Sequence, residues 1–160
     1  MTDDPLEIVR KILAAGRTAS VTTRAPNGEL HSRPLAVIEH DFDGTLWFFT
    51  ADPSSKTADV AADPDVNVSV GDGKGWVSMS GTAVVSRDQA RIDEYWNPWA
   101  EAYFEGGRDD PAVALLEVTV TSVHYWDLDK PAIVNAFEVV KGIVTRTPPD
   151  LGDDGVVHLS

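Results

Sequence analysis

The stretch HSRPLAVIEHDFDGTLWFFTADPSSK, residues 31–56, contains two strand-like runs with a turn between them. The apolar runs PLAVI and TLWFFT flank the turn sequence HDFDG, so we predict that strands over 31–39 and 45–50 pair across that turn. Two serines then precede an alanine-containing segment that ends at Pro64. This pattern predicts a short helix over 54–62 that is capped at its start by a serine hydroxyl.

Strand patterns continue on both sides of this stretch. Upstream, TASVTT at 18–23 is separated from the next strand by Asn27-Gly28, a strong hairpin-turn signal. Downstream come VNVSV, WVSMSGTAVV and the longest run, AVALLEVTVTSVHYWDLD, at 66–70, 76–85 and 112–129. We therefore predict a mainly β (α+β) fold of about six antiparallel strands, long enough to curl into a barrel, with flanking helices.

Helical patterns lie near the start, middle and end of the chain. Residues 5–15 carry an amphipathic pattern bounded by proline and glycine, and residues 88–96 return to helical spacing. The segment 132–144 fits a strand or a helix by periodicity, and its length and alanines favour a helix. We expect 147–160 to form an irregular tail. Because no repeat or linker interrupts the chain, residues 1–160 are predicted to form a single domain.

Composition and charge exclude several classes of protein. No apolar run approaches the roughly 18 residues that a membrane span needs. The formal net charge of -13 repels nucleic acid and anionic membranes, so we expect neither as a partner. The absence of cysteine excludes disulfides and thiolate nucleophiles. The amino-terminal residues lack the basic segment and continuous apolar core of a signal peptide, and we therefore expect a cytoplasmic protein.

The sequence offers little sign of a metal site. Its four histidines are scattered through unlike contexts, where a structural histidine is more common than a ligand. The Asp-Asp pairs at 3–4, 109–110 and 153–154 lie near termini or turns, where solvated charge is the usual explanation. We assign no metal.

The basic and hydroxyl side chains around the second strand suggest an anion site. If the two strands pair across HDFDG, Arg33 lies near Thr50, and Ser55 and Lys56 begin a helix at the same end. A guanidinium, an ammonium, hydroxyl groups and the amides of a helix start are the groups that bind a phosphate monoester. In the alternative interpretation, Arg33 lies on the surface, Lys56 pairs with a helix aspartate at 59 or 63, and the hydroxyls cap the helix. The residue pattern leaves these two interpretations level.

Seven motifs occur in an order that resembles a known family. They are LHSRPLAV, DFDGTLWFFT, SSK, VNVSV, WVSMSGTAVVSRD, YWNPW and LLEVTVTSVHYWD, and they cover most of residues 6–128. Together they are similar to the FMN-binding split barrels related to pyridoxamine 5'-phosphate oxidase, in the branch of the bacterial general stress proteins. The resemblance implies a six-stranded antiparallel split β-barrel that forms a homodimer, with FMN sites at the interface and FAD as a possible substitute.

The resemblance also implies a set of cofactor-binding residues. By position, Arg33 and Lys56 match the phosphate-binding cations, and the backbone over 33–36 would face the edge of the flavin ring. Trp96 would approach the ring, while plain packing at an interface is an equal alternative for it. The full set that we expect to bind the cofactor is Ser32, Arg33, Pro34, Leu35, Phe49, Thr50, Ser55, Lys56, Ser78, Ser80 and Trp96.

Departures from the family pattern bear on the activity. Ile38 stands where the oxidases carry a substrate-contacting lysine, the strand-five glutamine is replaced around Trp76, and the segment 147–160 lacks their arginine and histidine motif. Oxidation of pyridoxamine phosphate is therefore not expected. The leading hypothesis is an FMN-dependent oxidoreductase for a small molecule, with substrate, electron donor and catalytic residues unassigned. The alternatives are a non-catalytic flavin-binding stress protein and a split barrel that binds no flavin or another cofactor, such as a tetrapyrrole.

Overall fold

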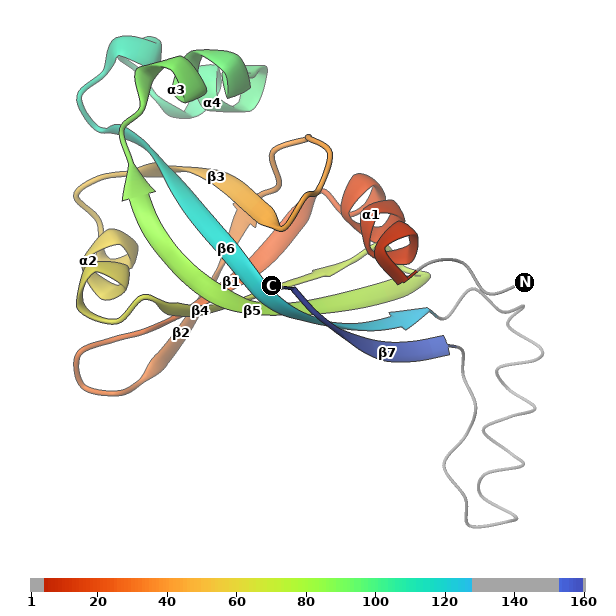
Figure 1. Cartoon of the computed structure of the whole chain (residues 1–160). Helices are drawn as coiled ribbons and strands as arrows, with labels where there is room; N and C mark the ends of the chain where they lie inside the picture. Colours follow the sequence, from red (N-terminus) through yellow and green to blue (C-terminus); the bar gives the residue numbers. More distant parts are fainter. Residues whose placement is uncertain (1–4, 128–152, 160) are drawn as a thin grey trace, which may run out of the picture.

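The computed structural model describes residues 5–127 and 153–159, and it is built around one antiparallel sheet (Figure 1). Its strands run in the order β2-β1-β4-β5-β6-β3, and β7 pairs with β6 beside this path. The strands are β1 Thr18–Arg24, β2 Leu30–Ala36, β3 Thr45–Ala51, β4 Asp65–Gly71, β5 Gly75–Ser86, β6 Val113–Asp127 and β7 Asp153–His158. The helices are α1 Pro5–Ala15, α2 Ser55–Ala62, α3 Gln89–Tyr95 and α4 Pro98–Tyr103, followed by a short 3-10 helix, Gly107–Asp109.

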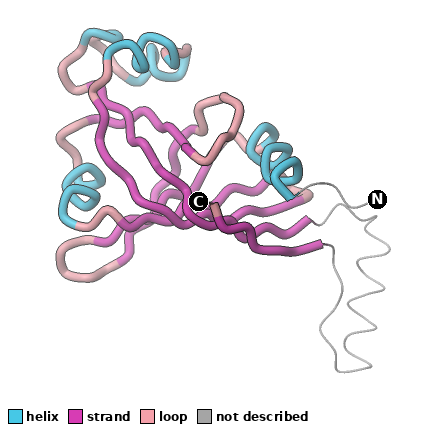
Figure 2. The backbone as a smooth tube through the Cα atoms, viewed as in Figure 1, coloured by secondary structure: helices cyan, strands magenta, loops and turns pink. Residues whose placement is uncertain are grey.

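The sheet curls strongly but does not close on itself (Figures 1 and 2). Strand β2 pairs with β1, whereas β3 pairs with β6 at the other end of the strand order. The mainly β fold with flanking helices is thus confirmed, while the predicted pairing of β2 with β3 is wrong. The segment between them does not form a tight hairpin, because β2 and β3 have other partners. It contains His40, whose ring nitrogens lie 3.1 and 2.8 Å from the carbonyl oxygens of Ile38 and Thr45.

Within the described residues, the sheet has one strand more than the sequence patterns predicted. Strand β7 pairs with the second half of β6, with Val156 opposite His124. The first half of that edge is taken by β3, with Phe48 opposite Leu116. The prediction of an irregular tail is therefore wrong over Asp153–His158, because β3 leaves the second half of the β6 edge unpaired and β7 pairs with it. The helix predicted over 132–144 and the tail residues 147–152 lie outside the described residues.

The main core lies inside the curled sheet. Alternate residues of β1, β4 and β5 are buried, among them Val21, Val68 and Met79. The apolar stripe of α1 covers one end of this core, as the amphipathic pattern predicted. Gly75 allows this approach, because a Cβ at that position would lie 2.7 Å from Cδ1 of Ile12. Full burial of each large aliphatic side chain contributes about 1.5 to 3 kcal/mol.

A second, smaller core lies where α3 and α4 pack on β3 and β6. It contains Trp47, Phe49 and Leu115 from the strands, with Ile92 and Phe104 from the inserted segment. Strand β3 is consequently buried on both faces. After residue 96, the Asn97 side chain accepts a hydrogen bond from the Ala100 amide and starts α4. None of the helices in the described ranges combines the length and apolar character needed to cross a bilayer.

Candidate functional site

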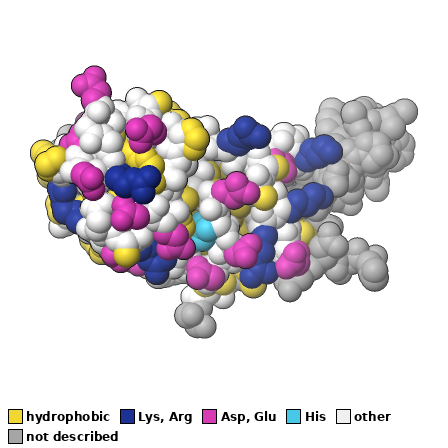
Figure 3. Space-filling model, turned by 90° about the horizontal axis from the view of Figure 1, so that it is seen from above, with side chains coloured by type: hydrophobic (Ala, Val, Ile, Leu, Met, Phe, Trp, Pro, Cys, Tyr) yellow, Lys and Arg dark blue, Asp and Glu magenta, His cyan; other side chains and the backbone are white. Residues whose placement is uncertain are grey.

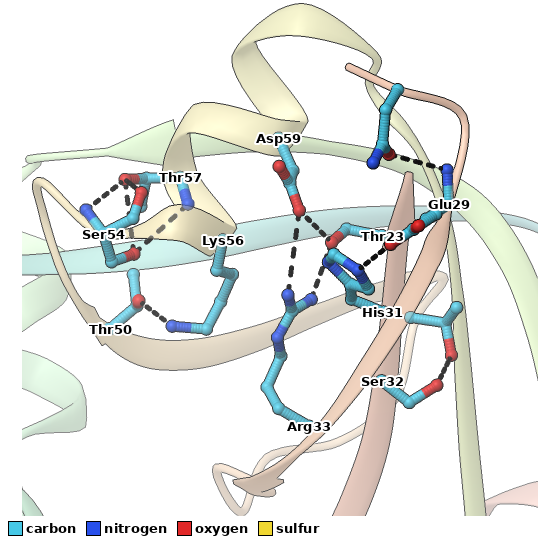
Figure 4. Close-up of polar contacts among 12 residues, drawn as sticks. Thr23, Glu29, His31, Ser32, Arg33, Thr50, Ser54, Lys56, Thr57 and Asp59 are labelled. Atoms are coloured by element: carbon cyan, nitrogen blue, oxygen red, sulfur yellow. Dashed lines mark hydrogen bonds and ion pairs between the residues drawn. The ribbon is translucent and has the colours of Figure 1, made fainter. Parts of the chain in front are cut away.

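Arg33 lies in the middle of β2. Its side chain is on the inner face of the sheet, because it pairs with the buried Val21 of β1. Its guanidinium is held by two side chains (Figure 4). Nη1 donates a hydrogen bond of 2.7 Å to Oγ1 of Thr23, and Nη2 lies 3.7 Å from Oδ2 of Asp59. The Thr23 hydroxyl in turn donates to the same Asp59 oxygen over 2.9 Å. With a side-chain exposure of 20%, Arg33 is a partly buried cation rather than a solvated one.

Lys56 provides a second cation next to the first. Its Nζ donates a hydrogen bond of 2.7 Å to Oγ1 of Thr50, a residue buried at the end of β3. Partial burial lowers the pKa of Lys56, and the nearby Arg33 guanidinium lowers this pKa further. Arg33, Thr50 and Lys56 therefore converge as predicted, although the two strands that carry the first two residues do not pair.

The start of α2 brings backbone donors to this cluster. Ser54 is the N-cap: its hydroxyl accepts a 3.2 Å hydrogen bond from the Thr57 amide, and its own amide donates to the Thr57 hydroxyl over 2.9 Å. The next two amides, those of Ser55 and Lys56, have no acceptor within the part of the chain that the structure describes. The Ser55 side chain is exposed at this helix end. These groups could donate hydrogen bonds to an anion.

An ion pair fixes the segment that leads from β3 into α2. Arg87 donates from Nη2 to Oδ2 of Asp52 over 2.6 Å and from Nη1 to the Pro111 carbonyl oxygen over 2.6 Å. The Thr57 hydroxyl and the Arg87 guanidinium together hold the pKa of Asp52 below its usual value. This arrangement ties α2 to β5 and to the turn before β6.

A shallow groove lies on the outer face of the sheet near Arg33. Its volume is about 310 Å³, and it is lined by Thr18, Ala19, Ser20, Ser32, Arg33, Pro34, Ser69, Gly71 and Trp76. The Trp76 indole, 46% exposed, forms one wall and lies so close to Gly71 that a Cβ there would overlap it. Of the lining residues, only Arg33 has an ionisable side chain. The Arg33 side chain points to the opposite face of the sheet, toward Thr23 and Asp59, so the groove can accept a largely uncharged group.

The predicted serines of β5 lie on the same outer face as the groove. Asn67 donates from Nδ2 to the Ser78 hydroxyl over 3.0 Å, and its contact with the Ser80 hydroxyl is longer, 3.5 Å. Ser69 lies between these polar residues and the groove, because it lines the groove and pairs with Ser78.

The remaining predicted residues are spread over different surroundings. Ser32 and Pro34 face outward into the groove, and Leu35 packs against the main core. Phe49 is buried and meets Trp96 edge-on, with ring centroids 5.6 Å apart, inside the second core. Trp96 also donates from Nε1 to Glu101 over 2.6 Å. The structure thus brings Phe49 and Trp96 together, but on the face of β3 opposite to Thr50.

Thr23 and Asp59 both contact Arg33, although the sequence did not predict either residue as part of the phosphate site. Both are almost fully buried, at 1% and 5% exposure. A signal existed for Asp59, since a polar residue one helical turn after Lys56 shares its helix face. The alternative pairing of Lys56 with a helix aspartate does not occur among the described residues: Asp59 contacts Arg33, and Asp63 lies 3.4 Å from Arg24.

Comparison with known proteins identifies the family. The model of the pyridoxamine 5'-phosphate oxidase-like family matches residues 4–150. The chain belongs to this family. Protein bli-3 of Neurospora crassa is 29% identical over 161 residues, which cover 91% of this chain and 76% of that protein.

Solved structures of general stress proteins share the fold. A candidate general stress protein 26 of Jannaschia sp. CCS1 has a TM-score of 0.72 and 26% identity, covering 96% of this chain and 99% of its own. The general stress FMN/FAD binding protein of Xanthomonas citri has a TM-score of 0.67 and 27% identity, covering 79% of this chain and 89% of its own. These relatives place the chain with the general stress proteins of the family, as the ordered motifs predicted.

Proposed function

We propose that this protein binds FMN and that the phosphate of FMN binds between Arg33 and Lys56. The observation that carries the proposal is the approach of two partly buried cations, of which only Arg33 has a carboxylate partner, Asp59, among the described residues. A phosphate monoester carries nearly two negative charges at neutral pH and accepts several hydrogen bonds. The free amides at the start of α2 supply further donors around the same point.

The wider surface explains why such a site depends on local geometry. Seen from above in Figure 3, Lys and Arg side chains are interspersed with Asp and Glu. The chain as a whole carries a formal charge of -13, which repels a dianion. Only a local cluster with low exposure can offset this repulsion, because screening by water weakens an exposed cation.

We further propose that the flavin ring occupies the outer groove, next to Pro34 and Trp76. The uncharged lining of the groove suits the ring, and the backbone of β2 runs between the groove and the phosphate site. Once bound, FMN would supply hydride transfer to or from a small molecule. The chain's own groups would position the phosphate and limit access of water to one side of the ring. The Xanthomonas citri relative is described as binding FMN or FAD, so a flavin with either tail fits this proposal.

A homodimer belongs to the same proposal. Trp76 and Val156, both large apolar residues, are exposed on the outer face of the sheet, at 46% and 55%. A second copy of the chain that packs on this face would cover them and enclose the groove. The predicted contribution of Trp96 to the ring would then require the partner chain, because this tryptophan lies in the second core of its own chain.

A flavin-binding protein without turnover is the second candidate. It is favoured by the groove, whose lining offers hydroxyls and an indole but neither a carboxylate nor an imidazole for proton transfer. The two candidates separate when the bound flavin is reduced anaerobically and mixed with electron acceptors such as quinones. Reoxidation faster than that of free FMN supports an oxidoreductase, and an equal or slower rate supports the non-catalytic protein.

The proposal is tested by mixing the purified protein with FMN, dialysing it and recording the absorbance spectrum. We expect flavin absorbance to remain with the wild-type protein and to be lost from Arg33→Ala. A wild-type protein that loses all its FMN would overturn the proposed function.

A further inference from the structure

The guanidinium of Arg33 is held in one orientation before any ligand arrives. Both terminal nitrogens, Nη1 and Nη2, face Thr23 and Asp59, as Figure 4 shows. Among the described residues, the Nε–H has no acceptor, which leaves the side edge of the guanidinium available. A guanidinium can use such an edge to bind two oxygens of one phosphate. The contacts of Nη1 and Nη2 therefore fix the direction in which the edge that carries the Nε–H points.

The polarity of the hydrogen bonds gives Asp59 a specific part in this orientation. Thr23 has a single hydroxyl proton, and it donates this proton to the Asp59 carboxylate. Its oxygen is consequently free to accept from Arg33, which donates to it. An ionised carboxylate can only accept, so Asp59 fixes the direction of the whole chain of hydrogen bonds. The three side chains form a chain of hydrogen bonds that runs from Arg33 on β2 through Thr23 on β1 to Asp59 on α2.

The position of Asp59 is unfavourable for an anion site if charge alone is considered. A carboxylate that is 5% exposed and 3.7 Å from the phosphate-binding arginine repels a phosphate through a poorly screened medium. It also neutralises part of the positive charge that Arg33 and Lys56 supply. Any favourable contribution of Asp59 to ligand binding must therefore have another origin. An arginine side chain that is already ordered loses less entropy when the ligand binds.

We propose that Thr23 and Asp59 are positioning residues for Arg33: they lock its terminal nitrogens so that its side edge is presented to the phosphate of the ligand. This inference rests on the proposed function, since it assigns partners to the same phosphate site. It predicts that the preference for FMN over riboflavin, which lacks the phosphate, depends on Thr23 as well as on Arg33.

The test measures the dissociation constants of FMN and riboflavin for four proteins: wild type, Thr23→Val, Arg33→Ala and the double variant. Valine has nearly the shape of threonine but no hydroxyl. We expect Thr23→Val to lower the FMN preference about five- to tenfold, as the loss of one hydrogen bond does. In the Arg33→Ala background the same change should have no further effect, because there is no guanidinium left to position.

Controls separate positioning from a loss of stability. Val68→Ala removes methyl groups from the buried residue that pairs with Val21, and it should lower the melting temperature without changing the FMN preference. A Thr23→Val protein that keeps the wild-type preference, or an equal loss with and without Arg33, would overturn the positioning role. A wild type with no preference for FMN over riboflavin would overturn the proposed phosphate site itself, and the positioning role with it.

Asp59→Asn tests the second residue. The amide has the same shape but can turn its NH₂ group toward Thr23, which would reverse the hydroxyl and set it against Arg33. We expect this variant also to lose FMN preference. If FMN instead binds more tightly, Asp59 acts only as a competing charge, and its positioning role is overturned.

Discussion

Two basic side chains, those of Arg87 and Lys56, lie where β3 leads into α2, and they differ in their counter-charges. Arg87 is half exposed and forms a 2.6 Å ion pair with Asp52. Lys56 is partly buried, donates only to the Thr50 hydroxyl among the described residues, and has Arg33 as its charged neighbour. Arg87 has what a structural cation needs, whereas Lys56 has a neighbour of its own sign. The difference teaches that a ligand site can be recognised by a charge that the fold leaves uncompensated.

The largest effect that would test this comparison is the loss of Arg33. We expect Arg33→Ala to weaken FMN binding by about 1.5 to 3 kcal/mol, or roughly 10- to 150-fold, because a charged hydrogen-bond donor is lost. Arg87→Ala is the matched control, since Arg87 lies outside the proposed phosphate site and forms a close ion pair with Asp52. Fluorescence titration of both variants checks the expectation. Equal losses of affinity in the two variants would remove the distinction between the two sites.

Replacement of Lys56 should move affinity and stability in opposite directions. We expect Lys56→Met to bind FMN about tenfold more weakly, because an ammonium contact is lost. The flavin-free variant should melt at a higher temperature than the wild type, because an ammonium that is poorly solvated and faces Arg33 has been removed. Differential scanning fluorimetry without FMN measures this gain. A lower melting temperature would indicate that the hydrogen bond to Thr50 outweighs the cost of the charge.

The lowered pKa of Lys56 also predicts how stability depends on pH. In the unfolded chain the ammonium titrates near its usual value of about 10.4, whereas in the folded chain it loses its proton at a lower pH. Between these two values the unfolded state binds more protons, so this residue makes the flavin-free protein more stable as pH rises. FMN affinity should fall over the same window, because the cation is lost. Chemical denaturation and FMN titration at several alkaline pH values, with Lys56→Met as the reference, measure both trends.

The smallest effect is expected at the Arg87 and Asp52 ion pair. Its partial exposure limits its contribution to about 0 to 1 kcal/mol at neutral pH. Because folding lowers the pKa of Asp52, this contribution is present above the usual carboxyl pKa of about 4 and is lost as pH falls through the folded value. Urea denaturation of Arg87→Ala and wild type should therefore differ slightly at pH 7 and converge in strong acid. A difference that persists in acid would show that the hydrogen bond to Pro111 dominates.

Local patterns in the sequence predicted most elements of this fold. The serine cap and Pro64 predicted α2, which the structure places at Ser55–Ala62. Strand-like runs in the sequence predicted β1, β4 and β5, in which alternate residues are buried, and the amphipathic pattern predicted α1. Strand pairing was harder to predict, because the partner of β3 is β6, more than sixty residues away in the sequence. A strong turn signal at Asn27-Gly28 correctly predicted the hairpin of β1 and β2, whereas HDFDG did not produce one.

The candidate site was predicted in part for the same reason. Arg33, Thr50 and Lys56 were grouped on the expectation that β2 and β3 pair, and they converge although these two strands do not pair. Thr23 could not be added, since its side chain reaches Arg33 through the register of β1 with β2, in which Val21 rather than Thr23 lies opposite Arg33. The family resemblance implied that Trp96 lies near the ring, with packing at an interface as an equal alternative. The packing of α3 and α4 places it with Phe49 in the second core of its own chain.

The most direct test of the central claim compares FMN with riboflavin on the wild-type protein. The two ligands share the ring and the ribityl chain and differ in the phosphate, so the ratio of their dissociation constants reports on the site formed by Arg33 and Lys56. Isothermal titration calorimetry at neutral pH should give FMN an affinity at least tenfold higher than that of riboflavin. Equal affinities would contradict the claim that these two cations form a phosphate site.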